Sequence, residues 1–109
     1  MSTFEEFLTF DIRVGTVLSA RTHPTARKPA LQLEIDFGPA GIKRSSAQLT
    51  KRYDASALIG RQVAAVLGFP PRHIGDFVSE VLVLGAILPG NDIVLLAIDA
   101  LVPNGSPVA

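Results

Sequence analysis

Apolar and polar residues alternate along several short segments of the chain, and this pattern predicts β-strands. The clearest alternation runs from residue 30 to residue 37, where every second side chain is apolar. Successive side chains of a strand point to opposite faces, so one face of this strand is expected to be buried and the other solvated. The expected buried side chains are Leu31, Leu33, Ile35 and Phe37, and the expected exposed ones are Gln32, Glu34 and Asp36.

Five further segments are bounded by turn residues, as strands usually are. Four of them are rich in apolar residues, and the segment 42–49 is more polar. Gly15 interrupts the first of these segments, and a glycine inside a strand suggests a bulge or a sharp bend. Glycine and proline at 38–41 and 89–92 predict turns. The expected strands are residues 11–20, 42–49, 61–69, 80–88 and 93–98.

Two short helices are expected beside the strands. Thr3 and Glu6 have the spacing of a capping box, which predicts a helix over residues 4–8. Asp54 is a candidate cap, and Gly60 a candidate end, for a helix within residues 50–60. Strands and helices do not alternate along the chain, so a parallel sheet is not expected.

These five or six strands and their order predict an all-β fold, a small antiparallel barrel of the five-stranded OB-fold type. The OB-fold carries a short helix between its third and fourth strands, which is where the helix within residues 50–60 falls. A length of 109 residues fits a single domain, residues 1–109.

The composition excludes several classes of function. Ten basic and ten acidic residues balance, so no general attraction to nucleic acid or to an anionic membrane is expected. No cysteine is present, which excludes disulfides and thiolate metal sites. The acidic start of the chain does not resemble a signal peptide, and no apolar run of about 18 residues predicts a membrane span. A cytoplasmic location is therefore expected.

The content of apolar residues is high for a chain of this size. Hydrophobic residues make up 48% of the sequence and charged residues only 18%. A domain this small buries about 65% of the surface of its unfolded chain, which leaves much of the apolar surface uncovered. A shared interface or an exposed apolar groove is expected to take up the excess.

The chain lacks the residue patterns of common catalytic centres. His23 and His73 each lie near prolines and basic residues, and neither lies at helical spacing from a carboxylate. No HExxH motif and no histidine–carboxylate cluster occurs in the sequence. The sequence therefore predicts a non-enzymatic protein without a metal or a cofactor.

Basic residues are expected near the second and third strands and their loops, which form the nucleic-acid face of an OB-fold. Lysine and arginine at such a face pair with phosphates. The alternative is that they are simply solvated, and aromatic side chains for base stacking are scarce. The candidates are Arg27 and Lys28 before the second strand, Lys43 and Arg44 in the third, Lys51 and Arg52 after it, and Arg72.

Two adjacent serines in the third strand are a second unusual feature. Ser45 and Ser46 must point to opposite faces, so one of them faces inward or toward a partner, where its hydroxyl needs a hydrogen bond. Gln48 is long enough to reach a backbone group of the protein or of a bound strand. The alternative is a polar edge strand that resists aggregation.

Five phrases occur in order along the chain: DIRVGTV (11–17), ARKPALQLEIDFG (26–38), GIKRSSAQLT (41–50), FPPRHIGDFVSEVLVLGA (69–86) and VPNG (102–105). Together they resemble the CsaA family of bacterial export-related chaperones. That family belongs to the wider group of tRNA-binding domains, which includes a domain of some methionyl-tRNA synthetases. The resemblance covers nearly the whole chain, and its specific phrases are SSAQLT and FPPR…SEVLVLG.

The resemblance implies an OB-fold with extra terminal elements, assembled as a homodimer without catalytic activity. It also implies binding to peptide segments of unfolded or exported proteins, in association with the Sec translocation machinery. A homodimer agrees with the excess of apolar residues. The N-terminal helix and the tail are the expected dimer contact.

The wider tRNA-binding group carries a basic pair before its second strand and a Ser-Gln-Gly-Met phrase before its fifth. Arg27 and Lys28 stand in the place of the first, and Ser79 stands in the place of the serine. Glu80 replaces the glutamine, and an ionised glutamate only accepts hydrogen bonds and repels an RNA backbone. The chain therefore favours a polypeptide ligand, with tRNA binding as the alternative.

Prolines stiffen the segment that leads to the expected strand over residues 80–88. Pro70 and Pro71 fix φ and are expected to hold Arg72, Ser79 and Glu80 at the rim of the barrel, above apolar strands. A polar rim over an apolar floor suits an extended peptide better than a polyanion. The alternative is a rigid hairpin that seals the barrel or packs across the dimer. The residues expected to bind peptide or RNA are Arg27, Lys28, Lys43, Arg44, Ser46, Gln48, Arg72, Ser79 and Glu80.

Overall fold

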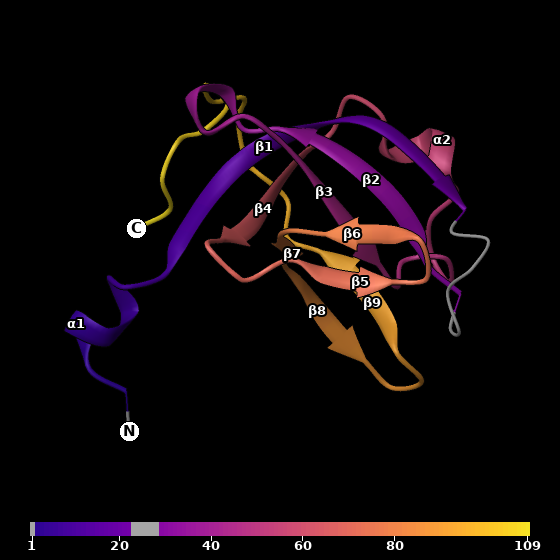
Figure 1. Ribbon diagram of the computed structural model, residues 1–109, viewed down its shortest axis with the longest axis horizontal. Helices are drawn as coiled ribbons and strands as arrows, with labels where there is room; N and C mark the ends of the chain where they lie inside the picture. Colours follow the sequence, from indigo (N-terminus) through magenta and orange to yellow (C-terminus); the bar gives the residue numbers. More distant parts are fainter. Residues whose placement is uncertain (1, 23–28) are drawn as a thin grey trace.

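The computed structural model describes residues 2–22 and 29–109. Its centre is an antiparallel sheet with the strand order β3-β2-β1-β4-β7. The sheet curls into a half-barrel, with the long strand β1 sweeping across it (Figure 1). The expected all-β architecture around a five-stranded antiparallel sheet is confirmed. The strands are β1 (Asp11–Thr22), β2 (Leu31–Asp36), β3 (Ile42–Ala47), β4 (Gln62–Leu67) and β7 (Leu82–Val83).

Two hairpins extend from the sheet. The single strand expected over residues 80–88 is wrong, because the chain leaves the sheet after β7 and starts a new hairpin at Gly85. A Cβ at Gly85 would lie 2.7 Å from Ile93 Cγ2, so the two strands of this hairpin approach closely. The turn at 89–92 is confirmed, and its tip has positive φ as two-residue hairpin turns require. The hairpins pair β5 (Arg72–Ile74) with β6 (Phe77–Ser79), and β8 (Gly85–Leu88) with β9 (Asp92–Leu95).

Both expected helices form, and both are short. The capping box of the first is confirmed, because Glu6 N donates to Thr3 Oγ1 and Thr3 N donates to Glu6 Oε1, each at 3.2 Å. All residues of this helix are exposed, and it lies apart from the sheet at the end of the molecule (Figure 1). Asp54 takes the N-cap position of the second helix, as expected. The helical elements are α1 (Phe4–Phe7), η1 (Gly38–Ala40) and α2 (Ala55–Leu58).

The alternation of residues 30–37 is confirmed on its apolar side. Leu31, Leu33, Ile35 and Phe37 are buried and form the centre of the core together with residues of β1, β4 and α2. On the polar side the expectation for Gln32 is wrong, because its side chain is only 7% exposed. Arg21 lies opposite Gln32 in the β1–β2 pair and donates a hydrogen bond to it, which covers that position.

Of the bulge or sharp bend expected at Gly15, the bulge is wrong. Gly15 pairs with β4 in regular register, and the irregularity of β1 lies between Val17 and Ser19. A Cβ at Gly15 would lie 2.7 Å from both Ile35 Cγ2 and Phe37 Cδ1. The glycine is therefore required by close packing of β1 over the core.

The C-terminal residues 102–108 run along the first half of β1, where β2 does not reach. Val14 N donates to Ser106 O at 2.9 Å, and Val108 N donates to Ile12 O at 2.8 Å. These bonds satisfy β1 backbone groups in the way that a neighbouring strand would. The C-terminal element expected from the sequence is thus an addition to the edge of the half-barrel.

Candidate functional site

A cleft of about 290 Å³ lies beside the β5–β6 hairpin, where the hairpin meets β3 and β7. Four of the residues expected to bind a ligand come together here, namely Ser46, Arg72, Ser79 and Glu80. The rest of the lining is almost wholly apolar. A cleft of this kind can hold an apolar side chain while its polar rim binds the backbone beside it. The remaining lining residues are Phe69, Pro70, Ile74, Val81 and Leu82.

The polar rim of the cleft is fixed by hydrogen bonds to β3. Ser46 N donates to Ser79 Oγ at 3.0 Å. Glu80 N donates to Arg44 O at 2.8 Å, and Arg44 N donates to Glu80 Oε1 at 3.1 Å. Arg44 Nε lies 3.7 Å from the same carboxylate oxygen. Ser79 and Glu80 therefore occupy the edge of β3, and the charge of Glu80 is partly balanced by Arg44.

The two adjacent serines take different roles. Ser45 is buried, and its Oγ donates to Val81 O at 3.0 Å. Ser46 points to the opposite side of β3 and lines the cleft. The expectation that one serine faces inward and finds a hydrogen-bond partner is confirmed for Ser45.

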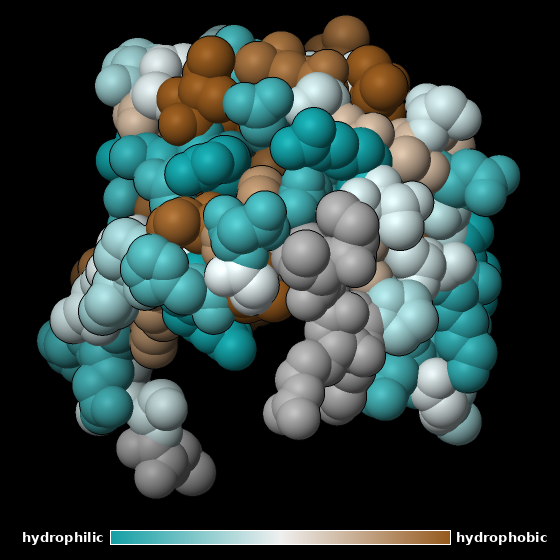
Figure 2. Space-filling view, turned by 45° about the vertical axis from the view of Figure 1, so that its right-hand side comes forward, coloured by the Kyte–Doolittle hydropathy of each residue, from teal (hydrophilic) through white to brown (hydrophobic). Residues whose placement is uncertain are grey.

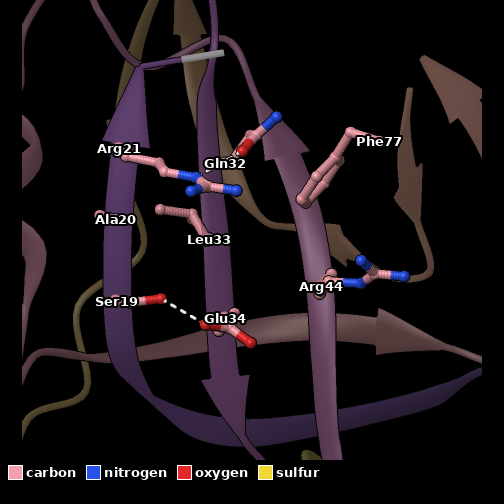
Figure 3. A pocket seen from close by; sticks show the side chains of 8 residues that line it. All are labelled: Ser19, Ala20, Arg21, Gln32, Leu33, Glu34, Arg44 and Phe77. Carbon is pink, nitrogen blue, oxygen red and sulfur yellow. Dashed lines mark hydrogen bonds between the residues drawn. The ribbon is translucent and has the colours of Figure 1, made fainter. Parts of the chain in front are cut away.

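A second pocket, of about 320 Å³, lies on the face of β1, β2 and β3 that points away from the core (Figure 3). Two cross-strand hydrogen bonds organise its floor. Ser19 Oγ donates to Glu34 Oε1 at 2.8 Å, and Arg21 Nε donates to Gln32 Oε1 at 2.8 Å. The full lining is Ser19, Ala20, Arg21, Gln32, Leu33, Glu34, Arg44 and Phe77.

The hairpin forms one wall of this second pocket. The Arg44 guanidinium lies 5.4 Å from the centre of the Phe77 ring, which is a cation–π distance. Phe77 is buried, so the ring supports Arg44 more than it offers an open stacking surface. Sequence reasoning missed Arg21 and Gln32, because only the β1–β2 register places them opposite each other.

The other expected site residues lie elsewhere. Lys43 points to the opposite face of β3 from Arg44, because successive side chains alternate. Gln48 lines a third pocket, of about 370 Å³, together with Lys51 and the β8–β9 turn. Arg27 and Lys28 lie outside the described residues. The candidates therefore do not form one continuous basic face among the residues that the structure describes.

The basic pair after β3 is engaged within the protein. Arg52 binds Asp92 with two hydrogen bonds, Nε to Oδ1 at 2.9 Å and Nη2 to Oδ2 at 2.6 Å. Lys51 Nζ donates to Gly90 O at 2.6 Å. The hydrogen bond from Arg52 lowers the pKa of Asp92 and raises the pKa of Arg52 itself. Lys51 and Arg52 together hold the β8–β9 turn against the segment that follows β3.

Much apolar surface is exposed, as the composition suggested. On the face in Figure 2, hydrophobic side chains gather along the upper edge, and smaller patches lie among the hydrophilic residues below. The N-terminal segment and the region from β7 to the tail contribute most of the exposed large side chains. These include Phe4, Leu8, Phe10, Leu82, Ile87, Leu96 and Leu101.

Within residues 2–22 and 29–109 there is no group of three or more histidine, aspartate or glutamate residues that could hold a metal ion. No helix in the same part of the chain is long and apolar enough to cross a membrane.

Comparison of the chain with known proteins identifies its family. Residues 12–107 match the family described as putative tRNA binding domain, and the chain therefore belongs to that family. Its curated relatives include the methionine–tRNA ligase of Porphyromonas gingivalis, 41% identical over 83 residues. That match covers 76% of this chain but only 12% of the ligase, so it concerns a small part of the enzyme.

Within this family the chain is similar to solved chaperones of the CsaA type, which confirms the resemblance. The chaperone CsaA from Bacillus anthracis is 51% identical with a TM-score of 0.95, and the match covers 100% of this chain and 99% of that one. The CsaA chaperone protein from Picrophilus torridus is 43% identical with a TM-score of 0.92, over the full length of both chains. These matches also confirm the expected OB-type fold class.

Proposed function

We propose that this protein is a non-enzymatic chaperone of the CsaA type. It binds extended segments of unfolded or presecretory polypeptide as a homodimer in the cytoplasm, and its clients pass to the Sec translocation machinery. The cleft beside the β5–β6 hairpin carries this proposal, because it joins a polar rim to an apolar floor. The similarity to CsaA chaperones over the full length of the chain supports it.

The chemistry of the cleft favours a polypeptide. Ile74, Val81 and Leu82 offer an apolar surface to a side chain, and transfer of a side chain of leucine size from water is favourable by about 1.5–3 kcal/mol. Arg72 and Glu80 on the rim carry opposite charges, which suits the alternating donors and acceptors of a peptide backbone. Pro70 helps to keep the rim ordered before the ligand arrives.

Exposed apolar residues support the homodimer. Phe4 is 70% exposed and Leu8 is 62% exposed, and no residue of the helix α1 is buried. An apolar surface of this kind is typical of an interface between copies. We therefore assign the dimer contact to α1 and its flanking residues, with the C-terminal tail beside them.

Binding of tRNA is the second candidate, because the family description names it. The described residues favour it less. Lys51 and Arg52 are bound to the β8–β9 turn. Glu34 lines the second pocket together with Arg21 and Arg44, and Glu80 lies 3.7 Å from Arg44. A phosphate backbone entering either pocket would approach these carboxylates.

A titration at two salt concentrations separates the two functions. The purified protein is titrated with a labelled peptide rich in apolar and basic residues and with labelled tRNA, at low and at near-physiological ionic strength. We expect peptide binding at both concentrations and loss of tRNA at the higher one, because release of counterions makes RNA affinity fall steeply with salt. Specific tRNA binding at near-physiological salt, without peptide binding, would contradict the proposal.

A further inference from the structure

The amide of Gln32 is a buried donor without an acceptor in the part of the chain that the structure describes. The residue is 7% exposed, and its side-chain Oε1 accepts the hydrogen bond from Arg21 Nε. Its Nε2 donates no hydrogen bond to any described residue. A buried amide donor that lacks a partner is unfavourable and rare in folded proteins, so this one marks a position where a ligand acceptor fits.

Arg21 presents a second set of donors beside this amide. Its Nε is occupied by Gln32, and the guanidinium forms no ion pair with any described carboxylate. The side chains of Arg21 and Gln32 lie together over β1 and β2, whereas the Arg44 guanidinium points away from them toward the hairpin (Figure 3). The Nη groups of Arg21 therefore form an open fork next to the free donor of Gln32.

We infer that the second pocket binds a side-chain carboxylate of the polypeptide, held by Arg21 and Gln32. A guanidinium fork matches the two oxygens of a carboxylate, and charge-assisted hydrogen bonds are stronger than neutral ones. Gln32 Nε2 donates to the same ligand residue, which satisfies the buried amide. This inference rests on the proposed function for the nature of the ligand, and it names the class of side chain that the client presents here.

The surroundings favour one carboxylate over a chain of phosphates. Glu34 lines the pocket on one side. A polyanion would bring further negative charges next to this carboxylate, and like charges oppose binding. A single acidic residue between neutral or basic neighbours meets the fork and leaves Glu34 facing neutral or positive groups.

The two pockets lie close enough to be used by one segment. Strand β6 contributes Phe77 to the second pocket and Ser79 to the apolar cleft, two residues further along. Two residues of a strand span roughly 7 Å. Arg44 lines the second pocket and also contacts Glu80 on the rim of the cleft. An extended client is therefore expected to carry its acidic residue within a few positions of the apolar side chain that fills the cleft.

A small probe tests the carboxylate site without any polypeptide. N-acetylglutamate amide is titrated into ¹⁵N-labelled protein, with N-acetylglutamine amide as the neutral match. We expect saturable shifts of the Gln32 side-chain amide and the Arg21 Nε–H signals with the glutamate compound alone. Arg21→Lys keeps the charge but loses the fork and should remove the saturation, whereas Arg61→Gln, outside the pocket, should not. Equal shifts with both compounds, or none, would overturn the inference.

Peptides then separate the subsite from the proposed function. Two apolar peptides that differ only by Glu or Gln are compared, and Glu should bind about fivefold more tightly, as expected for one partly exposed ion pair. Arg21→Gln and Gln32→Leu should abolish this difference. If both peptides bind equally, the subsite is wrong and the proposed function stands. If neither binds but the glutamate probe saturates, the proposed function fails and the subsite stands. Arg21-dependent binding of a short RNA, with no preference for Glu, would make this a phosphate site.

Discussion

Arg52 and Arg21 are both exposed arginines, but they differ in what their guanidinium groups contact. The guanidinium of Arg52 donates two hydrogen bonds to Asp92, forty residues away along the chain. Arg21 donates through Nε to Gln32, and its Nη groups meet no carboxylate in the described structure. A count of basic residues treats the two as equal. The difference shows that a charged residue is available to a ligand only when its own chain does not already satisfy it.

The same distinction applies to other groups, and it predicts which substitutions act on stability and which on binding. Groups satisfied within the chain, such as Ser45, should affect unfolding and leave binding intact once the protein is folded. Groups left open, such as the apolar residues of α1 and of the cleft, should affect assembly or binding and leave the free energy of unfolding of one protomer nearly unchanged.

The largest effect is expected at the exposed apolar residues of the N-terminal segment. Replacing Phe4 and Leu8 together by serine removes two large apolar side chains from the proposed dimer contact, and the dissociation constant should rise at least about 100-fold. Sedimentation equilibrium measures this change. Ile59→Ser, an exposed apolar residue after α2, is the matched control and should leave the dimer unchanged. A double variant that stays dimeric at low protein concentration would show that α1 is not the contact.

Ser45→Ala should have the next largest effect, on stability. The substitution leaves Val81 O without its buried hydrogen bond, which lowers the free energy of unfolding by about 1–3 kcal/mol. Urea unfolding followed by circular dichroism measures the loss. Ser56→Ala, at an exposed position of α2, is the comparison. An equal loss in both variants would remove the distinction between the two serines.

A substitution in the floor of the cleft should act on binding. Ile74→Ser removes apolar contact with the client side chain and should weaken an apolar peptide about tenfold, with little change in the unfolding midpoint. Isothermal titration at near-physiological salt gives the affinity. Ile59→Ser again serves as control. Unchanged peptide affinity in Ile74→Ser would place the ligand outside this cleft.

The smallest effect is expected at Arg52. The pKa of Asp92 is lowered by Arg52, so this pair adds stability above the unfolded-state pKa of about 3.9, and the contribution disappears as the pH falls through the lower folded-state pKa. Arg52→Gln should lower the thermal midpoint slightly at neutral pH and not at all in strong acid. Differential scanning at several pH values tests this, with peptide affinity unchanged. A difference that persists at the lowest pH would assign the effect to something other than the charge of Asp92.

The sequence predicted those elements whose signal is local. The alternation around Leu33 and the capping box of Thr3 and Glu6 depend on neighbours in sequence, and both were confirmed. The cleft residues Arg72, Ser79 and Glu80 were predicted together because a proline-stiffened hairpin keeps them within a few residues of one another.

What the sequence did not predict depends on register between distant strands. Gln32 was expected to be exposed because period-two alternation does not show which side chains of a neighbouring strand lie over the polar face. In the structure Arg21 of β1 covers Gln32. Gly15 was read as a bulge or a sharp bend because the local pattern does not show that Ile35 and Phe37 press against it. Pairing of this kind is fixed only when the whole sheet has formed.

Residues 105–108 pair with β1 like a strand, so this part of the fold forms only after the C-terminal residues are present. The Arg13 side chain bonds to Gly105 O across 92 positions of the chain, and the backbone of β1 bonds to residues 105–108. Contacts so distant in sequence slow folding, because a long loop must close before they form. During synthesis β1 emerges before the tail, so this part of its edge lacks its partners until residues 105–108 have been made. A protein proposed to bind unfolded chains therefore exposes an unpaired strand edge of its own during synthesis. This edge is paired only after the C-terminal residues have been synthesised.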